Sequence, residues 1–385
     1  ASIDGGRTVA VAWTAWQQVG MAAALARRSG LGAAAGVPCA HPLLGRMTSA
    51  GPDEWRFEAS LSATGHWIVD EHRLRSGEAL IPGTGYLDLA RAALAEAGVI
   101  GPTELRDVAF LAPCVAPSTG HVTLRVRLTR SGGEFEFVIE SEGSDGVREH
   151  ARGRGGASRA ARPAPLALDA VAARTTRVAS GAAATDPHLA FGPRWHNLRK
   201  AAFGEREALL TLALPDDAVA DVGLHALHPA LLDMATAGAQ ELVLGRDAAR
   251  DFYVPLSYGR LVAHAPLTPA AHSHVRLRAG AGRDVAVYDV TITDESGTVL
   301  VEVSEFTMRL LRDTGLSASP ASRATVRPAN PVLEVGLASG IRPAEGIDAL
   351  TRVLAALPGP HVVVSPQPLE ALLASLAAPA PSARY

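Results

Sequence analysis

The stretch PGTGYLDLARAALAEAG, residues 82–98, carries the strongest fold signal in the chain. Its apolar side chains recur at roughly helical spacing, and a proline opens it, as is common in the first turn of a helix. Gly98 follows the periodic run, where glycine often ends a helix. The pattern predicts a buried helix whose core positions are Leu87, Leu89, Ala92 and Leu94.

Apolar and polar residues alternate downstream of this helix. Residues 122–129 follow a period of two, and residues 135–139 resume it after Ser131-Gly132-Gly133. A glycine pair between two alternating runs is typical of a tight hairpin turn. We therefore predict a β-hairpin with one face in water.

The second half of the sequence repeats this order of elements. HPALLDMATAGAQELV (228–243) is the predicted helix, and residues 274–311 supply three strands, broken near 280–282 and 294–297. A long apolar helix wrapped by an antiparallel sheet, formed twice in one chain, is a double hotdog. The predicted fold class is therefore α+β.

Composition argues against several classes of function. The 385 residues carry a formal net charge of −3, with a pI near 6.5, so no global basic surface favours nucleic acid. No apolar run of ~18 residues predicts a membrane span, and Gln17-Gln18 interrupts the apolar run of 9–30, which we interpret as amphipathic. Cys39 and Cys114 indicate incidental thiols of a reducing compartment, with a disulfide as the alternative, and the cytoplasm is the expected location.

Composition shifts mark three candidate linkers, at 30–36, 151–165 and 314–330. With the two predicted hotdogs they divide the chain into five segments: 1–40, a terminal segment with its linker; 41–150, the N-terminal hotdog; 151–180, a linker; 181–313, the C-terminal hotdog; and 314–385, a linker with the second terminal segment.

His72 is the first candidate for chemistry. It lies ten residues before Pro82, which opens the predicted helix. Neutral imidazole has an unperturbed pKa of about 6.5 and suits removal of a proton next to a thioester carbonyl. N–H groups around Gly83 to Gly85 would face the developing negative charge on the carbonyl oxygen. The alternative is a structural histidine before a helix.

Asp233 is the second candidate, because it is a carboxylate inside an apolar helical run. A buried carboxylate either finds a partner or stays protonated, and the protonated form can donate to a departing hydroxyl. The alternative is a helix-end or solvent-facing aspartate. We interpret His228-Pro229 as the structural entry to this helix.

The sequence contains none of the common cofactor motifs. It has no CxxC, HExxH or EF-hand pattern, no GxGxxG or P-loop, and no GxSxG elbow. The remaining histidines and carboxylates form no recognisable ligand pattern. We therefore expect no metal and no nucleotide cofactor, in keeping with redox-neutral acid–base chemistry.

Four motifs in order resemble the dehydratase domains of modular type I polyketide synthases, over about 41–312. They are HPLLG (41–45), DEHRLRSGEALIPGTGYLDLARAAL (70–94), FGPRW (191–195) and HPALLD (228–233). The resemblance implies that His72 is the base and Asp233 the acid, one from each hotdog, facing a shared tunnel. The substrate-binding residues that it implies are Pro82, Gly83, Phe191, Gly192 and Pro193.

The same resemblance implies partners. The substrate would be carried on the phosphopantetheine of an acyl carrier protein, with no other cofactor, and neighbouring synthase domains and a homodimer would be expected. Nucleic acid and membrane are not expected partners.

Three positions depart from the family pattern. Pro82 lies one residue late after His72, which predicts an altered loop. Phe191 replaces a tyrosine, removing a hydroxyl near the substrate. Ala237 replaces a glutamine or histidine four residues after the aspartate, so we expect Thr236 or Gln240 to orient the carboxyl from the same helix face.

The two ends show a second resemblance. Residues 10–26 look like a late strand and helix of a polyketide ketoreductase, and residues 340–372 look like its final helix and strand. Val9–Trp13 and His361–Val364 would then pair as parallel strands, without binding NADPH. The alternative is that both ends are ordinary linker.

The expected activity is elimination of water from a carrier-bound β-hydroxyacyl thioester, giving an α,β-enoyl thioester. A first alternative is a domain that also closes an oxygen heterocycle or shifts the double bond. A second is a catalytically silent scaffold.

Overall fold

The computed structural model describes residues 10–13, 36–143, 146–178, 187–243, 246–247, 250–280, 282–311, 348–349, 351–353, 355 and 361–364. These residues fall into two compact units. One unit spans Ala35–Ser317, and the other combines Ala1–Ala34 with Ala318–Tyr385. The larger unit carries the predicted site.

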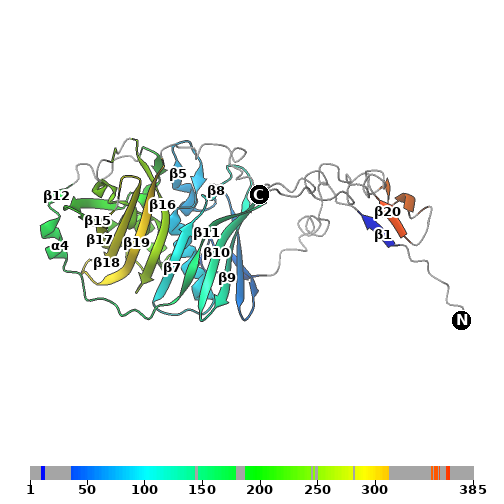
Figure 1. The fold of residues 1–385 in the computed structure, drawn as a ribbon, viewed down its shortest axis with the longest axis horizontal. Coiled ribbons are helices and arrows are strands. Elements are labelled where there is room, and N and C mark those ends of the chain that lie inside the picture. Colours follow the sequence, from blue (N-terminus) through cyan, green and yellow to red (C-terminus); the bar gives the residue numbers. More distant parts are fainter. Residues whose placement is uncertain are drawn as a thin grey trace, which may run out of the picture. The chain divides into compact units, whose positions relative to one another are not determined.

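A 14-stranded sheet dominates the larger unit. One half contains strands from the first part of the sequence, in the order β7-β11-β10-β9-β4-β3-β2 (Figure 1). Its strands are β2 Val37–Pro38, β3 Arg46–Ala50, β4 Glu54–Leu61, β7 Thr103–Phe110, β9 Val122–Ser131, β10 Glu134–Gly143 and β11 Gly146–Ala157.

The other half follows in the order β12-β14-β15-β17-β18-β19-β16. Its strands are β12 Arg177–Val178, β14 Leu198–Phe203, β15 Glu207–Ala213, β16 Phe252–Ala263, β17 Ala270–Leu277, β18 Val285–Thr293 and β19 Val299–Leu311. β16 and β7 pair antiparallel, from Ser257 opposite Ala109 to Ala263 opposite Thr103, and so join the halves.

Each half wraps one central helix. α3 (Gly83–Glu96) contacts β7, β9, β10 and β11, whereas α5 (Pro229–Ala237) contacts β15, β17 and β18. α3 turns its apolar face toward the sheet, where Leu87, Leu89 and Leu94 are fully enclosed. The α+β double hotdog predicted from the sequence is thereby confirmed.

Local signals account for most element boundaries. Gly98, at φ +90°, follows the end of α3 as predicted. The β9–β10 turn holds Gly132 at φ +58° and Gly133 at φ +90°, the left-handed conformations that a tight hairpin requires. The three strands expected within 274–311 are also present.

The second helix is shorter than predicted. The sequence favoured a helix through residue 243, but α5 ends at Ala237 and a separate 3-10 turn, η3, spans Gln240–Leu242. Gly238 caps the end of α5, and glycine has a low helix propensity.

Short elements surround the helix starts. A four-stranded sheet has the order β13-β5-β6-β8. Its strands are β5 His72–Leu74, β6 Ala79–Leu80, β8 Val115–Ala116 and β13 Leu189–Phe191, and the remaining helices of this unit are α2 Trp67–Asp70, α4 Leu168–Arg174, η1 Pro193–Trp195 and η2 Asp216–Gly223.

The stretch interpreted as a linker from 151 contains regular structure. Residues 151–157 belong to β11, which pairs with both β10 and β7, and α4 and β12 follow before residue 180. The Arg-rich composition reflects the solvent face of this strand rather than a break in the chain, because Arg152 and Arg154 are exposed.

In the smaller unit, β1 (Ala10–Trp13) and β20 (His361–Val364) pair parallel, with Ala10 opposite His361. The predicted parallel pairing is confirmed, whereas the ketoreductase resemblance of these ends stays a prediction. The helix predicted within 14–26 and the linker predicted at 314–330 lie outside the described residues.

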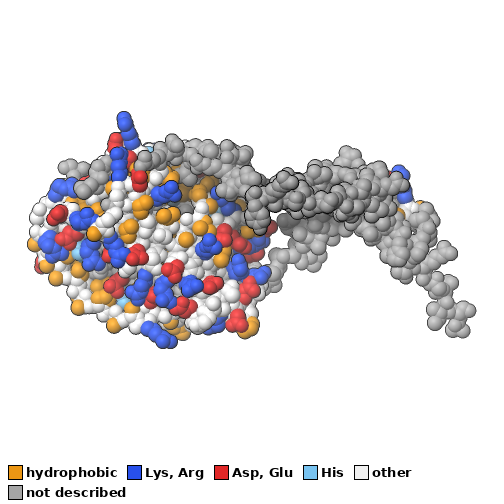
Figure 2. All heavy atoms as spheres, in the orientation of Figure 1, with side chains coloured by type: hydrophobic (Ala, Val, Ile, Leu, Met, Phe, Trp, Pro, Cys, Tyr) orange, Lys and Arg blue, Asp and Glu red, His pale blue; other side chains and the backbone are white. Residues whose placement is uncertain are grey.

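The visible face of the larger unit carries intermixed basic and acidic side chains among apolar ones (Figure 2). Within the described residues, no helix combines the length and hydrophobicity needed to cross a bilayer.

Candidate active site

His72 lies at the start of β5, opposite Phe191 of β13. Its side chain is almost fully enclosed, at 6% exposure. The segment between His72 and Pro82 forms a small hairpin, β5–β6, whose turn holds Gly77 at φ +103°. Glycine adopts this left-handed backbone conformation readily, and the altered loop expected from the spacing of His72 and Pro82 stays a prediction.

A backbone contact determines the imidazole tautomer of His72. Its Nδ1 lies 3.1 Å from the carbonyl oxygen of Leu80. A carbonyl oxygen can only accept, so Nδ1 carries the hydrogen and donates it. Nε2 of the neutral ring then holds the lone pair, as a general base requires.

Asp233 lies in the second turn of α5 and is half-buried. Its Oδ2 accepts a hydrogen bond from the indole Nε1 of Trp195 over 2.8 Å. Trp195 ends η1 and is itself only 1% exposed. The carboxyl is thus less buried than expected from the sequence, and it has an identified donor.

The Trp195 indole brings the two candidates together. Its ring centroid lies 5.4 Å from that of His72, while its N–H reaches Asp233. His72 comes from the N-terminal half and Asp233 from the C-terminal half, so residues far apart in sequence flank one side chain.

The residues expected to orient Asp233 do other things. The hydroxyl of Thr236 donates to the carbonyl oxygen of Leu232 at 2.8 Å and lies 3.2 Å from the hydroxyl of Tyr258. Gln240 belongs to η3, beyond the end of α5, so it does not share a helix face with Asp233. That expectation is corrected, because an identified hydrogen bond to this carboxylate comes from Trp195, which donates to its Oδ2. Sequence reasoning missed it because no local pattern connects positions 195 and 233.

The two helix starts are bound to each other. The hydroxyl of Thr84, in the first turn of α3, donates to the carbonyl oxygen of Pro229, in the first turn of α5, over 3.0 Å. Pro82 caps α3 and is buried. A Cβ on Gly83 would lie 3.1 Å from Pro255 and 3.2 Å from Phe110, so those two side chains bound the space beside this glycine.

The FGPRW segment packs beside His72. Phe191 stacks on Trp195 at 6.0 Å between ring centroids and lies 5.7 Å from the His72 ring. A Cβ on Gly192 would lie 2.3 Å from the side chain of Glu71, so only glycine permits this approach. Pro193 opens η1 and is exposed. Four of the five predicted substrate-binding residues therefore cluster around the helix start and His72, with Pro193 at the surface.

Arg194 fastens this segment to its surroundings. Its guanidinium contacts carboxylates on both sides, at 2.5 Å from Glu71 and 2.6 Å from Asp221. Its backbone N–H also donates to Glu71 at 2.7 Å. Since Glu71 precedes His72 directly, these contacts hold η1 against β5.

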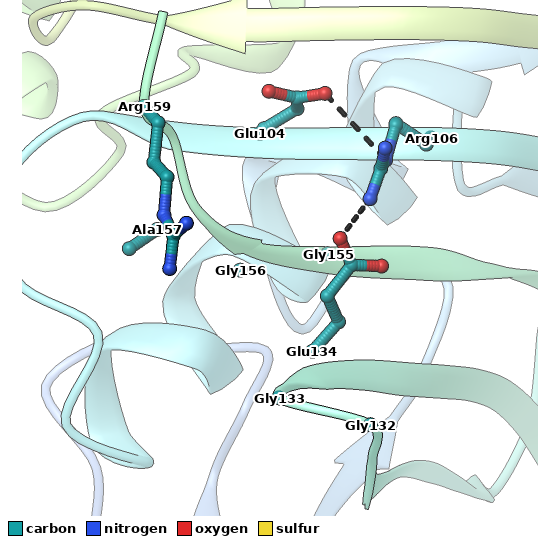
Figure 3. A pocket seen from close by; sticks show the side chains of 9 residues that line it. All are labelled: Glu104, Arg106, Gly132, Gly133, Glu134, Gly155, Gly156, Ala157 and Arg159. Atoms are coloured by element: carbon teal, nitrogen blue, oxygen red, sulfur yellow. Dashed lines mark hydrogen bonds and ion pairs between the residues drawn. The ribbon is translucent and has the colours of Figure 1, made fainter.

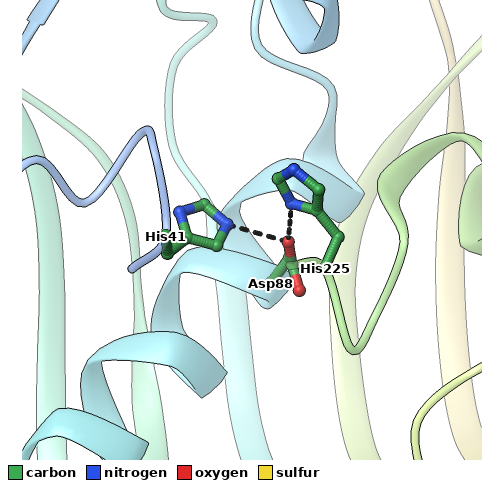
Figure 4. A group of neighbouring side chains, drawn as sticks. All are labelled: His41, Asp88 and His225. Carbon is green, nitrogen blue, oxygen red and sulfur yellow. Dashed lines mark hydrogen bonds and ion pairs between the residues drawn. The ribbon is translucent and has the colours of Figure 1, made fainter. Parts of the chain in front are cut away.

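A buried group that sequence reasoning missed lies behind the site. Asp88 of α3, at 1% exposure, accepts from His41 Nε2 at 2.9 Å and His225 Nδ1 at 2.7 Å, both at Oδ2 (Figure 4). Its Oδ1 accepts the N–H of Leu227 at 3.0 Å. A carboxylate within an apolar helix, the signal that drew attention to Asp233, was equally present at Asp88.

These three side chains are also the described residues that could hold a metal ion. One ligand atom from each lies within 4.8 Å of the others, so the expectation that the remaining histidines and carboxylates form no cluster is wrong. The nitrogen–oxygen separations are those of hydrogen bonds, whereas ligands of a tetrahedral zinc stand about 3.3 Å apart. The geometry therefore favours a hydrogen-bonded triad.

Burial determines the charge of this region. Desolvation lowers the pKa of His66 and of His228 to about 4, with repulsion from His225 adding to the effect. Desolvation works against ionisation of Asp88, but its histidine partners outweigh it and hold its pKa below the usual value. His228 caps α5 by accepting the N–H of Leu231, which is the structural role predicted for it.

A surface hollow of about 450 Å³ lies elsewhere, around the β9–β10 turn and the ends of β7 and β11 (Figure 3). Arg106 there pairs with Glu134 and, at 3.5 Å, with Glu104. None of the predicted site residues lines it.

Two family models match the chain. The model described as polyketide synthase dehydratase domain matches residues 41–142, and that described as polyketide synthase dehydratase N-terminal domain matches 163–318. The chain belongs to the polyketide synthase dehydratase domains. Together the matches cover both hotdogs of this dehydratase domain.

Curated relatives are much longer than this dehydratase domain. The spectinabilin polyketide synthase system protein NorA' of Streptomyces orinoci is 31% identical over 284 residues, which are 70% of this chain and 7% of that protein. Polyketide synthase GfsE of Streptomyces halstedii is 32% identical over 315 residues, which are 74% of this chain and 8% of that protein.

Solved structures share the fold. A trans-AT polyketide synthase dehydratase domain from Brevibacillus brevis matches with a TM-score of 0.65 and 24% identity, over 71% of this chain and all of that one (100%). The dehydratase domain of the CurF module of the curacin synthase matches with a TM-score of 0.64 and 22% identity, over 70% and 99% of the two chains.

Proposed function

We propose that this domain removes water from a β-hydroxyacyl thioester during polyketide synthesis. The observation that carries the proposal is that His72 and Asp233 both lie against the buried indole of Trp195. The indole ring centroid is 5.4 Å from that of His72, and the indole N–H donates to the Asp233 carboxylate. A base and an acid on opposite halves can act on adjacent carbons of one substrate.

In the proposed reaction, Nε2 of His72 takes the proton from the carbon next to the thioester carbonyl. The electron pair of that C–H bond forms the double bond, and the C–O bond at the β-carbon breaks. Asp233 gives its proton to the departing hydroxyl, which leaves as water. The products are an α,β-enoyl thioester, a protonated His72 and an ionised Asp233, and a proton must return from the first to the second before the next cycle.

A structural relative supports the choice of these two kinds of side chain. In the CurK dehydratase, which shares the fold, one aspartate-to-asparagine and one histidine-to-phenylalanine substitution each give a protein described as inactive. One carboxyl and one imidazole are thus required there, the pair of groups proposed here.

The substrate would arrive on the phosphopantetheine arm of an acyl carrier protein, because the curated relatives are polyketide synthases. The tether would raise the local substrate concentration. Because the step is redox-neutral, the proposal includes no other cofactor. Neighbouring synthase domains would be the other partners.

The test is to incubate the 385-residue chain with β-hydroxyacyl pantetheine thioesters of both β-configurations, and to follow loss of one water by mass and olefin formation by absorbance. We expect turnover of one configuration, and a fall of at least ~100-fold in both His72→Phe and Asp233→Asn. Trp55→Phe, on strand β4 where the indole packs against Phe135, is the control.

An inert wild-type chain with every thioester would refute catalysis and favour the scaffold. Water loss followed by a mass-neutral change would instead indicate a cyclase or isomerase. The presence of Asp233 as a proton donor favours dehydration over isomerisation alone.

A further inference from the structure

We infer that Trp195 positions the Asp233 carboxyl and determines which of its oxygens carries the transferable proton, an inference that rests on the proposed function. Its indole N–H reaches Oδ2 over 2.8 Å. An indole N–H can only donate, so Oδ2 must accept. The proton of the acid therefore lies on Oδ1.

Hydrogen bonds from the side chain of Asn197 connect the segment that carries Trp195 to the helix that carries Asp233. Asn197, fully enclosed, donates from Nδ2 to the carbonyl oxygen of Ala230 at 3.0 Å and to that of Arg194 at 2.8 Å. Ala230 lies in the first turn of α5, one turn before Asp233, and Arg194 precedes Trp195. The indole is thus fastened to the helix that carries its acceptor.

Packing leaves the indole little freedom to turn away. It is 1% exposed and is stacked on Phe191 at an interplanar angle of 4°. Trp67 lies edge-on at 5.9 Å, and His72 lies at 5.4 Å. A rigid donor preserves a directional hydrogen bond better than a mobile surface side chain does.

Side chains of α5 itself do not provide a substitute. Thr236 points its hydroxyl at Leu232 and Tyr258. Position 237, one helical turn after Asp233, is occupied by alanine, which has no donor. A glutamine there would place an amide within reach of Asp233, because residues four apart on a helix are neighbours.

Two other titratable side chains lie on elements packed around Asp233. Tyr258 of β16 faces it, and burial raises the pKa of that phenol, so Tyr258 stays neutral at working pH. His72 of β5 lies across the indole. The Trp195 N–H stabilises the ionised carboxylate of Asp233. Loss of this donor would therefore raise the pKa of Asp233.

The experiment compares the wild type with Trp195→Phe, Ala237→Gln and the double variant, using the same pantetheine thioesters. Trp195→Phe keeps an aromatic ring but deletes the N–H. We expect kcat to fall roughly 10- to 100-fold with KM nearly unchanged, as for loss of one hydrogen bond to a charged group. We also expect the alkaline limb of the pH profile to move to higher pH, and Ala237→Gln to restore most of the activity in the double variant.

Thermal unfolding of every variant separates packing from orientation, with Trp55→Phe as the matched tryptophan loss. A Trp195→Phe variant that retains wild-type kcat and pH profile would overturn the inference while His72→Phe and Asp233→Asn still test the reaction. Loss of activity without a shifted alkaline limb and without rescue by Ala237→Gln would also overturn it, since it would make Trp195 a packing residue only. If Trp195→Phe does not fold, replacing Trp195 with its benzothiophene analogue, which has the same shape but no N–H, is expected to give the same changes, and wild-type kinetics would again refute the inference.

Discussion

Asp88 shows how a single charged residue can organise a buried region. Its carboxylate accepts from two histidines and one backbone N–H: His41 precedes β3, whereas His225 and Leu227 belong to the segment just before α5. Leu227, whose N–H it holds, lies two residues before α5. The position of Asp233 therefore depends partly on a residue that takes no part in the proposed chemistry.

We predict that Asp88→Asn lowers the free energy of unfolding by about 2–5 kcal/mol. An asparagine presents an NH2 group at one of the two oxygen positions, so either Leu227 or the histidine pair loses its acceptor. Chemical denaturation measures the change. Asp53→Asn, at a side chain 72% exposed, is the control, and equal stability of the two variants would contradict the prediction.

At the scale of elements, Gly155 of β11 permits the close approach of α3 to its sheet. A Cβ on Gly155 would lie 2.7 Å from Leu94 and 2.8 Å from Leu105. Next to it, Gly156 points to the other face, where a Cβ would meet nothing nearer than 4.0 Å. Strand glycine at 155 therefore permits close packing of the helix that begins beside His72.

We predict that Gly155→Ala destabilises the protein by about 1–3 kcal/mol, because the added methyl overpacks the helix–sheet contact. Gly156→Ala should be neutral or stabilising by a few tenths to about 1 kcal/mol, through reduced freedom of the unfolded chain. The midpoint of thermal unfolding compares these adjacent variants. Equal losses at both positions would show that backbone effects, and not the contact with Leu94, determine the result.

At the scale of the whole molecule, several buried histidines remain neutral in the folded state. Burial lowers the pKa of His66, His150 and His228 to about 4. In the unfolded chain they titrate near 6.5, so between pH 6.5 and 4 the unfolded state binds more protons. Acid therefore favours unfolding in this window. Asp88 and Glu207, whose pKa values are lowered, add a loss of stability as pH falls below about 4.

We predict that the midpoint of thermal unfolding falls steadily from pH 7 to pH 4.5. His150 and His228, both at most 2% exposed, each contribute up to about 1.4 kcal/mol per pH unit in this range. His150→Gln, which retains polar atoms beside Ser141 but does not titrate, should reduce the slope. A midpoint that is flat or rises on acidification would contradict this account.

Local patterns were sufficient for most elements of the fold. The helical period of 87–94, the Gly132-Gly133 turn and the alternating strands of 274–311 all appear where expected. They succeed because backbone conformation responds to side chains a few residues away. The end of α5 failed for the complementary reason: residues 239–243 are helix-compatible in sequence, but the chain turns at Gly238 to pack against the sheet.

What the sequence alone determined is the two helices and the motifs around them, and from those motifs His72 and Asp233 are predicted as the reactive groups. Only the tertiary structure decided their neighbours. Trp195 reaches Asp233 across 38 positions, and His225 reaches Asp88 across 137. Such pairs leave no periodic trace, because a hydrogen bond depends on distance in space, and distant segments meet only when the sheet and both helices have packed.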